Sequence, residues 1–211
     1  MATDRRLGTE GAENRAALLD AAERIMREEG YAAVTSRHLA ETAKLKPQLV
    51  HYYFRKMDDI FIALFRRFSD RYLENQLDIL LSDTPLTDLW DNTSDTENAT
   101  LMFEFMALSN HRKNMRSEIA RFGKQFRTTQ IKIIEKFFKD RDISGKDWPS
   151  IASLSFMMEA LSRTMAFDKA LGVTQGDADT REFVKRLIND LEILPSAKGA
   201  DATASRRNRA S

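Results

Sequence analysis

Basic and hydrogen-bonding side chains gather between residues 35 and 57, and they suit contact with a polyanion. Five Lys or Arg residues stand there against a single acid, Glu41, a local charge of about +4 (five minus one) in a chain whose formal net charge is +1. The basic residues are Arg37, Lys44, Lys46, Arg55 and Lys56. Clustered positive charge is what phosphate contact requires. An ordinary solvated helical surface would explain the charge count alone, so the spacing of the residues has to decide.

That spacing predicts two short helices joined by a tight turn. Thr35 or Ser36 suits the N-cap of the first helix, and Leu39 and Ala43 lie four residues apart on one face. Pro47 suits the first turn of the second helix, because its missing N–H would have no intrahelical partner there. The elements that must position the polar groups are therefore two helices on either side of residues 44–46.

The second helix is expected to turn Val50 and Phe54 inward. Its other faces then carry Gln48, Leu49, His51, Tyr52 and Tyr53. A two-helix corner of this size is a helix-turn-helix unit, in which the second helix lies in the major groove of DNA and the first crosses the backbone. The sequence thus predicts a DNA-binding corner.

The N-terminal third of the chain resembles the TetR-type bacterial transcriptional repressors over about residues 14–75. The resemblance is carried by Leu18, Leu19, Ala21, Ala22, Gly30, Tyr31, Thr35, Ser36, Leu39, Ala40, Ala43, Leu45, Tyr53 and Phe54. Lys44 stands where the family usually has Gly, and Lys46 where it usually has a capping Ser or Thr. Val50 and His51 replace the common Leu-Tyr pair, and residues 56–58 replace Ser-Lys-Glu. These departures concern the operator sequence and not the fold.

The resemblance implies which side chains meet DNA. Base contacts are expected from Arg37, Gln48, Leu49 and His51, because Arg can pair with guanine, Gln with adenine, and an apolar group with the thymine methyl. Phosphate contacts are expected from Thr35, Ser36, Lys46, Tyr52, Tyr53, Arg55 and Lys56. For His51 a structural role, and for Tyr53 a packing role, remain open alternatives.

Composition limits the other classes of function. The chain has 211 residues and no cysteine, which excludes disulfides and thiolate metal sites. Its first residues lack the apolar core of a secretory signal, and no stretch reaches the apolar length that spans a bilayer. We therefore expect a soluble, cytoplasmic protein with no membrane contact, no metal and no cofactor.

Apolar periodicity predicts an all-α fold with four parts. Residues 1–13 and 195–211 are expected to be disordered tails, residues 14–57 the DNA-binding domain, and residues 58–194 a helical effector-binding and dimerisation domain. Within these parts, helices are expected at about 14–29, 56–81, 86–90, 97–110, 112–140, 148–171 and 177–194. No alternating strand pattern is found.

The body carries many Met and Phe residues, which on spacing alone are core residues. The family resemblance raises a second interpretation, because such regulators hold an effector among their body helices. A mostly apolar pocket would then be lined by some of Phe68, Tyr72, Met102, Phe105, Met106, Phe122, Phe126 and Met158. Both interpretations stay open at this stage.

The last two helices are expected to form a homodimer interface, as in TetR-like proteins. Their apolar candidates are Leu154, Met157, Leu161, Met165, Phe183, Leu187 and Leu191. A two-fold dimer would present two recognition helices to a palindromic operator. The expected function is a DNA-binding repressor, released by a small-molecule effector of unknown identity.

The sequence also bears on two other classes of function. A helical-bundle enzyme is disfavoured, because the three histidines His38, His51 and His111 form no metal-binding spacing and no nucleophile or phosphate-binding motif occurs. The protein is thus expected not to be an enzyme. A regulator whose body contacts another protein is the second alternative.

Overall fold

The regular elements of the chain are helical wherever the structure describes them. The computed structural model describes residues 2–143 and 149–194, with side chains from residue 11 onward, and no strand occurs in these ranges. The predicted all-α fold is confirmed.

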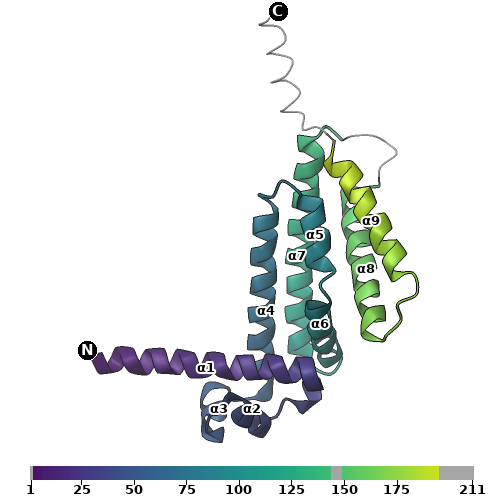
Figure 1. Cartoon of the computed structure of the whole chain (residues 1–211). Helices are drawn as coiled ribbons and strands as arrows, with labels where there is room; N and C mark the ends of the chain where they lie inside the picture. The colour runs from purple at the N-terminus through teal and green to yellow at the C-terminus, as the bar shows by residue number, and fades with distance from the viewer. Residues whose placement is uncertain (1, 144–148, 195–211) are drawn as a thin grey trace, which may run out of the picture. The chain divides into compact units, whose positions relative to one another are not determined.

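The helices follow one another with short connections (Figure 1). They are α1 (Ala2–Glu29), the 3-10 helix η1 (Tyr31–Ala33), α2 (Ser36–Ala43), α3 (Pro47–Tyr53), α4 (Met57–Ile79), α5 (Pro85–Thr93), α6 (Thr96–Ser109), α7 (Lys113–Asp140), α8 (Ile151–Ala170) and α9 (Asp177–Glu192). Each helix expected from the sequence is present. The 3-10 turn η1 was not expected.

The chain ends differ from expectation in one respect. We expected residues 1–13 to be disordered, whereas α1 begins at Ala2. The expected tail at 195–211 lies outside the described residues. At its other end α1 stops before Gly30, as predicted, and Gly30 has a φ of 84°, a conformation that favours glycine.

The described residues form two compact units. Unit 1 comprises the chain up to Arg71 together with Thr100–Phe122, and unit 2 comprises Tyr72–Ala99 together with the chain from Gly123 onward. The boundary expected between residues 57 and 58 falls inside unit 1. Helices α4, α6 and α7 contribute residues to both units.

In unit 1, α1, α2 and α3 pack around a small apolar core. Leu18, Ala22 and Ile25 recur at helical spacing on α1, and each is at most 1% exposed. They share the core with Leu39 and Ala40 of α2, Val50 of α3, Phe54, and Ile60, Phe61 and Leu64 of α4. This core fixes α2 and α3 beside α1.

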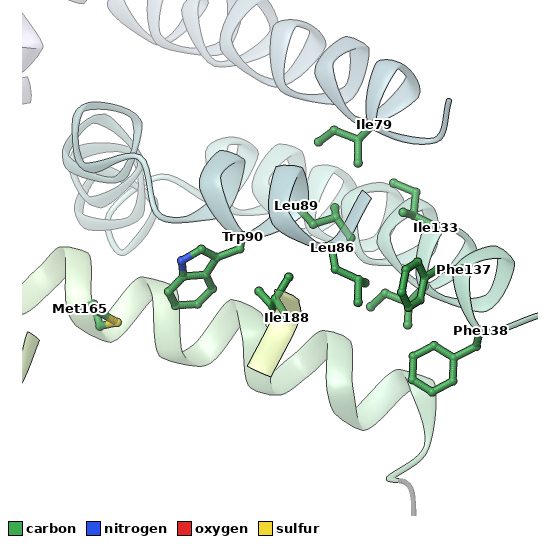
Figure 2. Packing of buried hydrophobic residues seen from close by; sticks show 10 residues of the cluster. Ile79, Leu86, Leu89, Trp90, Ile133, Phe137, Phe138, Met165 and Ile188 are labelled. Carbon is green, nitrogen blue, oxygen red and sulfur yellow. The ribbon is translucent and has the colours of Figure 1, made fainter. Parts of the chain in front are cut away.

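The core of unit 2 is built around the short helix α5 (Figure 2). Leu86, Leu89 and Trp90 of α5 contribute apolar side chains to it, and the other helices add Ile79, Ile133, Ile134, Phe137, Phe138, Met165 and Ile188. The first turn of α5 is held by Glu192 of α9, whose Oε1 accepts from the N–H of Leu86 at 2.8 Å and of Thr87 at 3.1 Å. A carboxylate there satisfies N–H groups that have no partner within the helix.

None of the helices in the described ranges combines the length and apolar character needed to cross a membrane.

Candidate nucleic-acid interface and interior site

The turn between α2 and α3 has the geometry of a helix-turn-helix corner. The Thr35 hydroxyl caps α2 by accepting from the N–H of His38 at 3.2 Å, as predicted. Lys44 ends α2 in the left-handed conformation with a φ of 54°. The N–H of Leu45 then donates to the carbonyl of Ala40 at 2.9 Å. The chain thus turns sharply with Lys where the left-handed conformation favours Gly.

The second helix of the corner presents a polar face. Lys46 precedes it without a side-chain capping bond, and Pro47 occupies its first turn. Val50 is 1% exposed and Phe54 3% exposed, so the predicted inward face is confirmed. The predicted base-contacting residues of α3 lie elsewhere on the helix: Gln48 and His51 are exposed, and Leu49 is half-buried.

Arg37, the other predicted base-contacting residue, is exposed on the first turn of α2. Its Nε donates to Glu41 Oε1 at 2.9 Å, and the two side chains are 87% and 61% exposed. A pair this exposed adds little stability, because solvent screens its charges. A guanine or phosphate can therefore compete for the guanidinium at little cost.

The predicted phosphate-contacting residues fall into two groups. Thr35, Lys46, Tyr52, Arg55 and Lys56 are exposed, and Tyr52 is 77% exposed despite its aromatic ring. Ser36 and Tyr53 are half-buried.

The two half-buried residues both have contacts inside unit 1. The hydroxyl of Ser36 donates to the sulfur of Met57 at 3.5 Å. The hydroxyl of Tyr53 faces α1, where a Cβ added to Gly11 would lie 3.6 Å from it. Tyr53 therefore lies next to α1, whereas its contact with phosphate stays a prediction.

Two carboxylates that sequence reasoning missed connect helices within unit 1. Glu104 of α6 accepts from the N–H of Tyr31 at 2.7 Å and so fixes the start of η1. Glu23 of α1 accepts from Arg27 at 2.9 Å, from Arg67 at 2.9 Å and from Arg71 at 3.0 Å. Only the Arg27 contact has a spacing visible in sequence.

The pairing with arginines lowers the pKa of Glu23. Burial alone would raise the pKa, but the hydrogen bonds from Arg27, Arg71 and Arg67 outweigh it and lower the pKa below its usual value. Glu118 of α7 has a similar environment, in which Arg66 and Arg121 lower its pKa to about 2.

The residues predicted to line one effector pocket belong to two units. In unit 1, Phe68, Phe105 and Phe122 pack against Phe65, with ring centroids 5.0–6.3 Å from that of Phe65. Met102 is half-buried, and Met106 is 38% exposed. The three phenylalanines are thus part of a packed core.

In unit 2, Tyr72 and Phe126 form an edge-to-face pair with centroids 5.7 Å apart, and Met158 packs against the core cluster of that unit. The Tyr72 hydroxyl donates to the carbonyl of Asn92 at 2.6 Å, and burial, followed by the nearby charge of Asp95, raises its pKa. The hydroxyl is therefore held as a hydrogen-bond donor.

The residues predicted for the dimer interface also separate by exposure. Met157, Phe183 and Leu187 are 47–59% exposed on α8 and α9, as a surface for a partner requires. Met165 is 6% exposed within the core of unit 2, and Leu154, Leu161 and Leu191 are half-buried against that core. Phe156 and Phe167, which the prediction omitted, are 56% and 48% exposed.

No group of three or more His, Asp or Glu side chains among the described residues is arranged to hold a metal ion. The arrangement that is present, a capped α2, a sharp turn and an α3 with an exposed polar face, defines the helix-turn-helix class of proteins.

Comparison with known proteins finds a family resemblance in the N-terminal part of the chain. The sequence model of the bacterial regulatory proteins of the tetR family matches residues 18–64, which include α2, α3 and the start of α4. The match thus covers the helix-turn-helix corner and the helices next to it, and it makes this part of the chain similar to the DNA-binding region of that family.

Individual relatives agree with this assignment. The chain is 42% identical over 52 residues to the HTH-type transcriptional regulator BetI of Rhizobium meliloti (strain 1021), a match that covers 25% of this chain and 26% of BetI. The chain therefore matches about a quarter of the length of this curated relative.

Solved structures share the fold over most of the chain. A transcriptional regulator from Saccharomonospora viridis, solved in complex with choline, has a TM-score of 0.72 at 18% identity and covers 85% of this chain and 95% of its own. The reduced form of NemR from E. coli has a TM-score of 0.70 at 14% identity and covers 87% of this chain and 100% of its own. At these identities the likeness concerns the fold.

Proposed function

We propose that this protein is a transcriptional repressor that binds a palindromic operator in double-stranded DNA as a homodimer and is released by a mostly apolar small molecule. The observation that carries the proposal is the exposed polar face of α3 on a corner that matches the tetR family. DNA binding follows from that face, and the remaining parts of the proposal rest on the body.

Base recognition is assigned to Arg37, Gln48, Leu49 and His51. A bidentate contact from Arg to guanine or from Gln to adenine contributes about 1–3 kcal/mol of discrimination. The exposed hydroxyl and basic groups around them, from Thr35 to Lys56, suit phosphates, which fix the register of the protein on the duplex without reading sequence.

Dimerisation is assigned to the exposed apolar side chains of α8 and α9, which lie side by side in unit 2 (Figure 1). Met157, Phe183 and Leu187 are joined there by Phe156 and Phe167. Exposed apolar groups gathered on two neighbouring helices mark a protein interface. A two-fold dimer presents two copies of α3, so its operator is palindromic.

Release is assigned to a population shift. In this mechanism a tilt of α4 separates the two DNA-binding corners of the dimer. An effector that binds this separated conformation more tightly would increase its population. A coupling free energy of about 1–3 kcal/mol would change operator affinity about 5- to 150-fold. The choline complex of the Saccharomonospora viridis protein supports small-molecule binding within this fold.

The proposal is tested by titrating the full chain onto DNA from upstream of its own gene and onto scrambled DNA of equal length, over a salt series. We expect tight binding to the first DNA only. Gln48→Ala should weaken that binding about tenfold or more, whereas Gln125→Ala, at an exposed position of α7, should leave it unchanged. Equal and steeply salt-dependent binding to both DNAs would mean phosphate attraction alone at that site, and the search would move to other promoters.

A further inference from the structure

Two glutamine side chains are completely buried in unit 2 with hydrogen-bonding atoms left unpaired. Gln76 of α4 is 0% exposed, and both its Nε2 and its Oε1 lack a partner. Gln130 of α7 is also 0% exposed, and its Nε2 lacks a partner. Buried polar groups are nearly always hydrogen-bonded in native proteins, so such atoms call for an explanation.

The two glutamines lie at the same level of the two helices. Four residues before them, Tyr72 and Phe126 have ring centroids 5.7 Å apart. Three residues after them, Ile79 and Ile133 belong to one buried cluster. Residues three and four apart share a helix face, so contacts on both sides place Gln76 and Gln130 between α4 and α7 at matching heights.

Two further helices reach this polar layer. Ser155 of α8 is fully buried and donates to Gln130 Oε1 at 2.5 Å. On α5, the carbonyl of Asn92 accepts from the Tyr72 hydroxyl at 2.6 Å, while Asn92 Nδ2 and Trp90 Nε1 lack partners. Figure 2 shows the Trp90 indole extending from α5 toward α8. The layer thus draws on α4, α5, α7 and α8.

The unpaired atoms are mostly neutral donors. Around the two glutamines they comprise the amide N–H groups of Gln76, Asn92 and Gln130 and the acceptor Gln76 Oε1. These donors are neutral, and an ion buried among them would lack the counter-charge that its desolvation demands. Asp95, whose charge acts on Tyr72, would also oppose an anion. The aromatic rings of Tyr72, Trp90 and Phe126 provide flat apolar walls.

We propose that this layer recognises the carbonyl oxygen of an uncharged aromatic molecule through the side-chain N–H groups of Gln76 and Gln130. This inference rests on the proposed function, because it gives the mostly apolar effector its chemical class. The two rings of the Tyr72–Phe126 pair pack the apolar part of the ligand, and the buried amides select against molecules that lack an acceptor.

The test uses three aromatic probes of similar size. Acetophenone has a neutral carbonyl group, ethylbenzene has no polar group, and benzoate carries a negative charge. The full chain carrying Trp148→Phe leaves Trp90 as its one tryptophan, because the sequence has two. We expect acetophenone to shift the Trp90 emission and raise the Tm, and to bind about tenfold more tightly than ethylbenzene or benzoate.

Matched variants locate the site. Gln76→Leu and Gln130→Leu should each reduce the preference for acetophenone over ethylbenzene about tenfold, whereas Gln125→Leu, exposed on α7, should leave it unchanged. Two variants keep the test decisive if one of them fails to fold. A preference that survives both glutamine substitutions would overturn the assignment.

The inference would also fail if acetophenone, benzamide and coumarin all left the Trp90 emission and the Tm unaltered. Operator binding is measured separately on the same preparation. It distinguishes failure of the carbonyl site from failure of the proposed function. Retained operator binding with no probe response rejects the carbonyl site alone, whereas probe binding without sequence-specific binding to any promoter rejects the proposed function.

Discussion

The two units use their interior polar groups in different ways. In unit 1, the half-buried carboxylate of Glu23 is satisfied by Arg27, Arg67 and Arg71. Unit 2 also pairs its carboxylates, as Glu192 does at the start of α5, but among the described residues it alone holds fully buried amides. A buried charge requires a partner, whereas an unpaired neutral amide has a smaller desolvation penalty. Leaving a buried amide unpaired in the absence of a ligand therefore costs less free energy than leaving a buried ion unpaired.

The largest effect is expected from breaking the pairing in unit 1. Glu23→Gln leaves Arg27, Arg67 and Arg71 without their common partner, and we expect it to lower the free energy of unfolding by about 2–3 kcal/mol. Urea unfolding of the full chain measures this loss. Glu28→Gln, an exposed position of the same helix, is the matched control. If the two variants lost equal stability, the Glu23 pairing would contribute nothing specific.

A second paired carboxylate of unit 1, Glu118, predicts that stability is lost in acid. Arg66 and Arg121 lower the pKa of Glu118 to about 2 from an ordinary value of 4.5. The folded state thus binds its proton later than the unfolded state, so the stabilisation is complete above about pH 4.5 and is lost as the pH falls toward 2. Both arginines are 57% exposed, so solvent weakens the effect. In urea unfolding, Glu118→Gln should show a smaller loss of stability between pH 5 and pH 3 than the wild type does; equal losses would assign the acid sensitivity to other carboxylates.

The exposed charges of unit 1 should matter for DNA more than for stability. Arg37→Ala is expected to weaken binding to the operator by about 1–3 kcal/mol, because a bidentate base contact is lost. Fluorescence anisotropy with operator and random DNA measures the difference, and Arg24→Ala, exposed on α1, is the control. An equal loss on both DNAs would show that Arg37 contacts only the backbone.

In unit 2, replacing an interior polar group is expected to raise the free energy of unfolding and not to lower it. Gln76→Leu removes an unpaired buried amide, so without a ligand we expect the protein to become more stable by about 1 kcal/mol. Urea unfolding of the ligand-free full chain is the measurement, and Gln125→Leu is the exposed control. A loss of stability instead would mean that ordered water already satisfies the Gln76 amide, and would remove the contrast between the units.

Local signals in the sequence were sufficient for the corner. Thr35, Pro47, Val50 and Phe54 occupy their expected places, because caps, prolines and inward faces depend on neighbours within a few residues. The contact between Glu104 and Tyr31 spans 73 residues and has no local pattern. It could therefore not be predicted.

Faces in the body were predicted less well, because helical periodicity finds apolar stripes without saying what covers them. Met165 was expected at a dimer surface but is buried in the core of unit 2, whereas Phe156 and Phe167 are exposed. The expected pocket likewise mixed residues of two units, because Phe and Met look alike in a core and in a binding site. The buried amides Gln76 and Gln130 were not singled out, since polar residues in a helix usually face solvent.

The smallest effect is expected at the turn of the corner, where Lys44 has a φ of 54°. Lys44→Gly relieves the left-handed strain but gives the unfolded chain more freedom, so the net gain in the free energy of unfolding should be about 0.5–1 kcal/mol. Lys44→Ala keeps the strain and removes the charge, and should give no such gain. Both variants should bind DNA with a slightly lower salt dependence, because one cation is lost from the exposed surface. If Lys44→Ala stabilised the protein as much as Lys44→Gly, the cause would be relief of charge repulsion among the basic residues of unit 1 and not the backbone conformation.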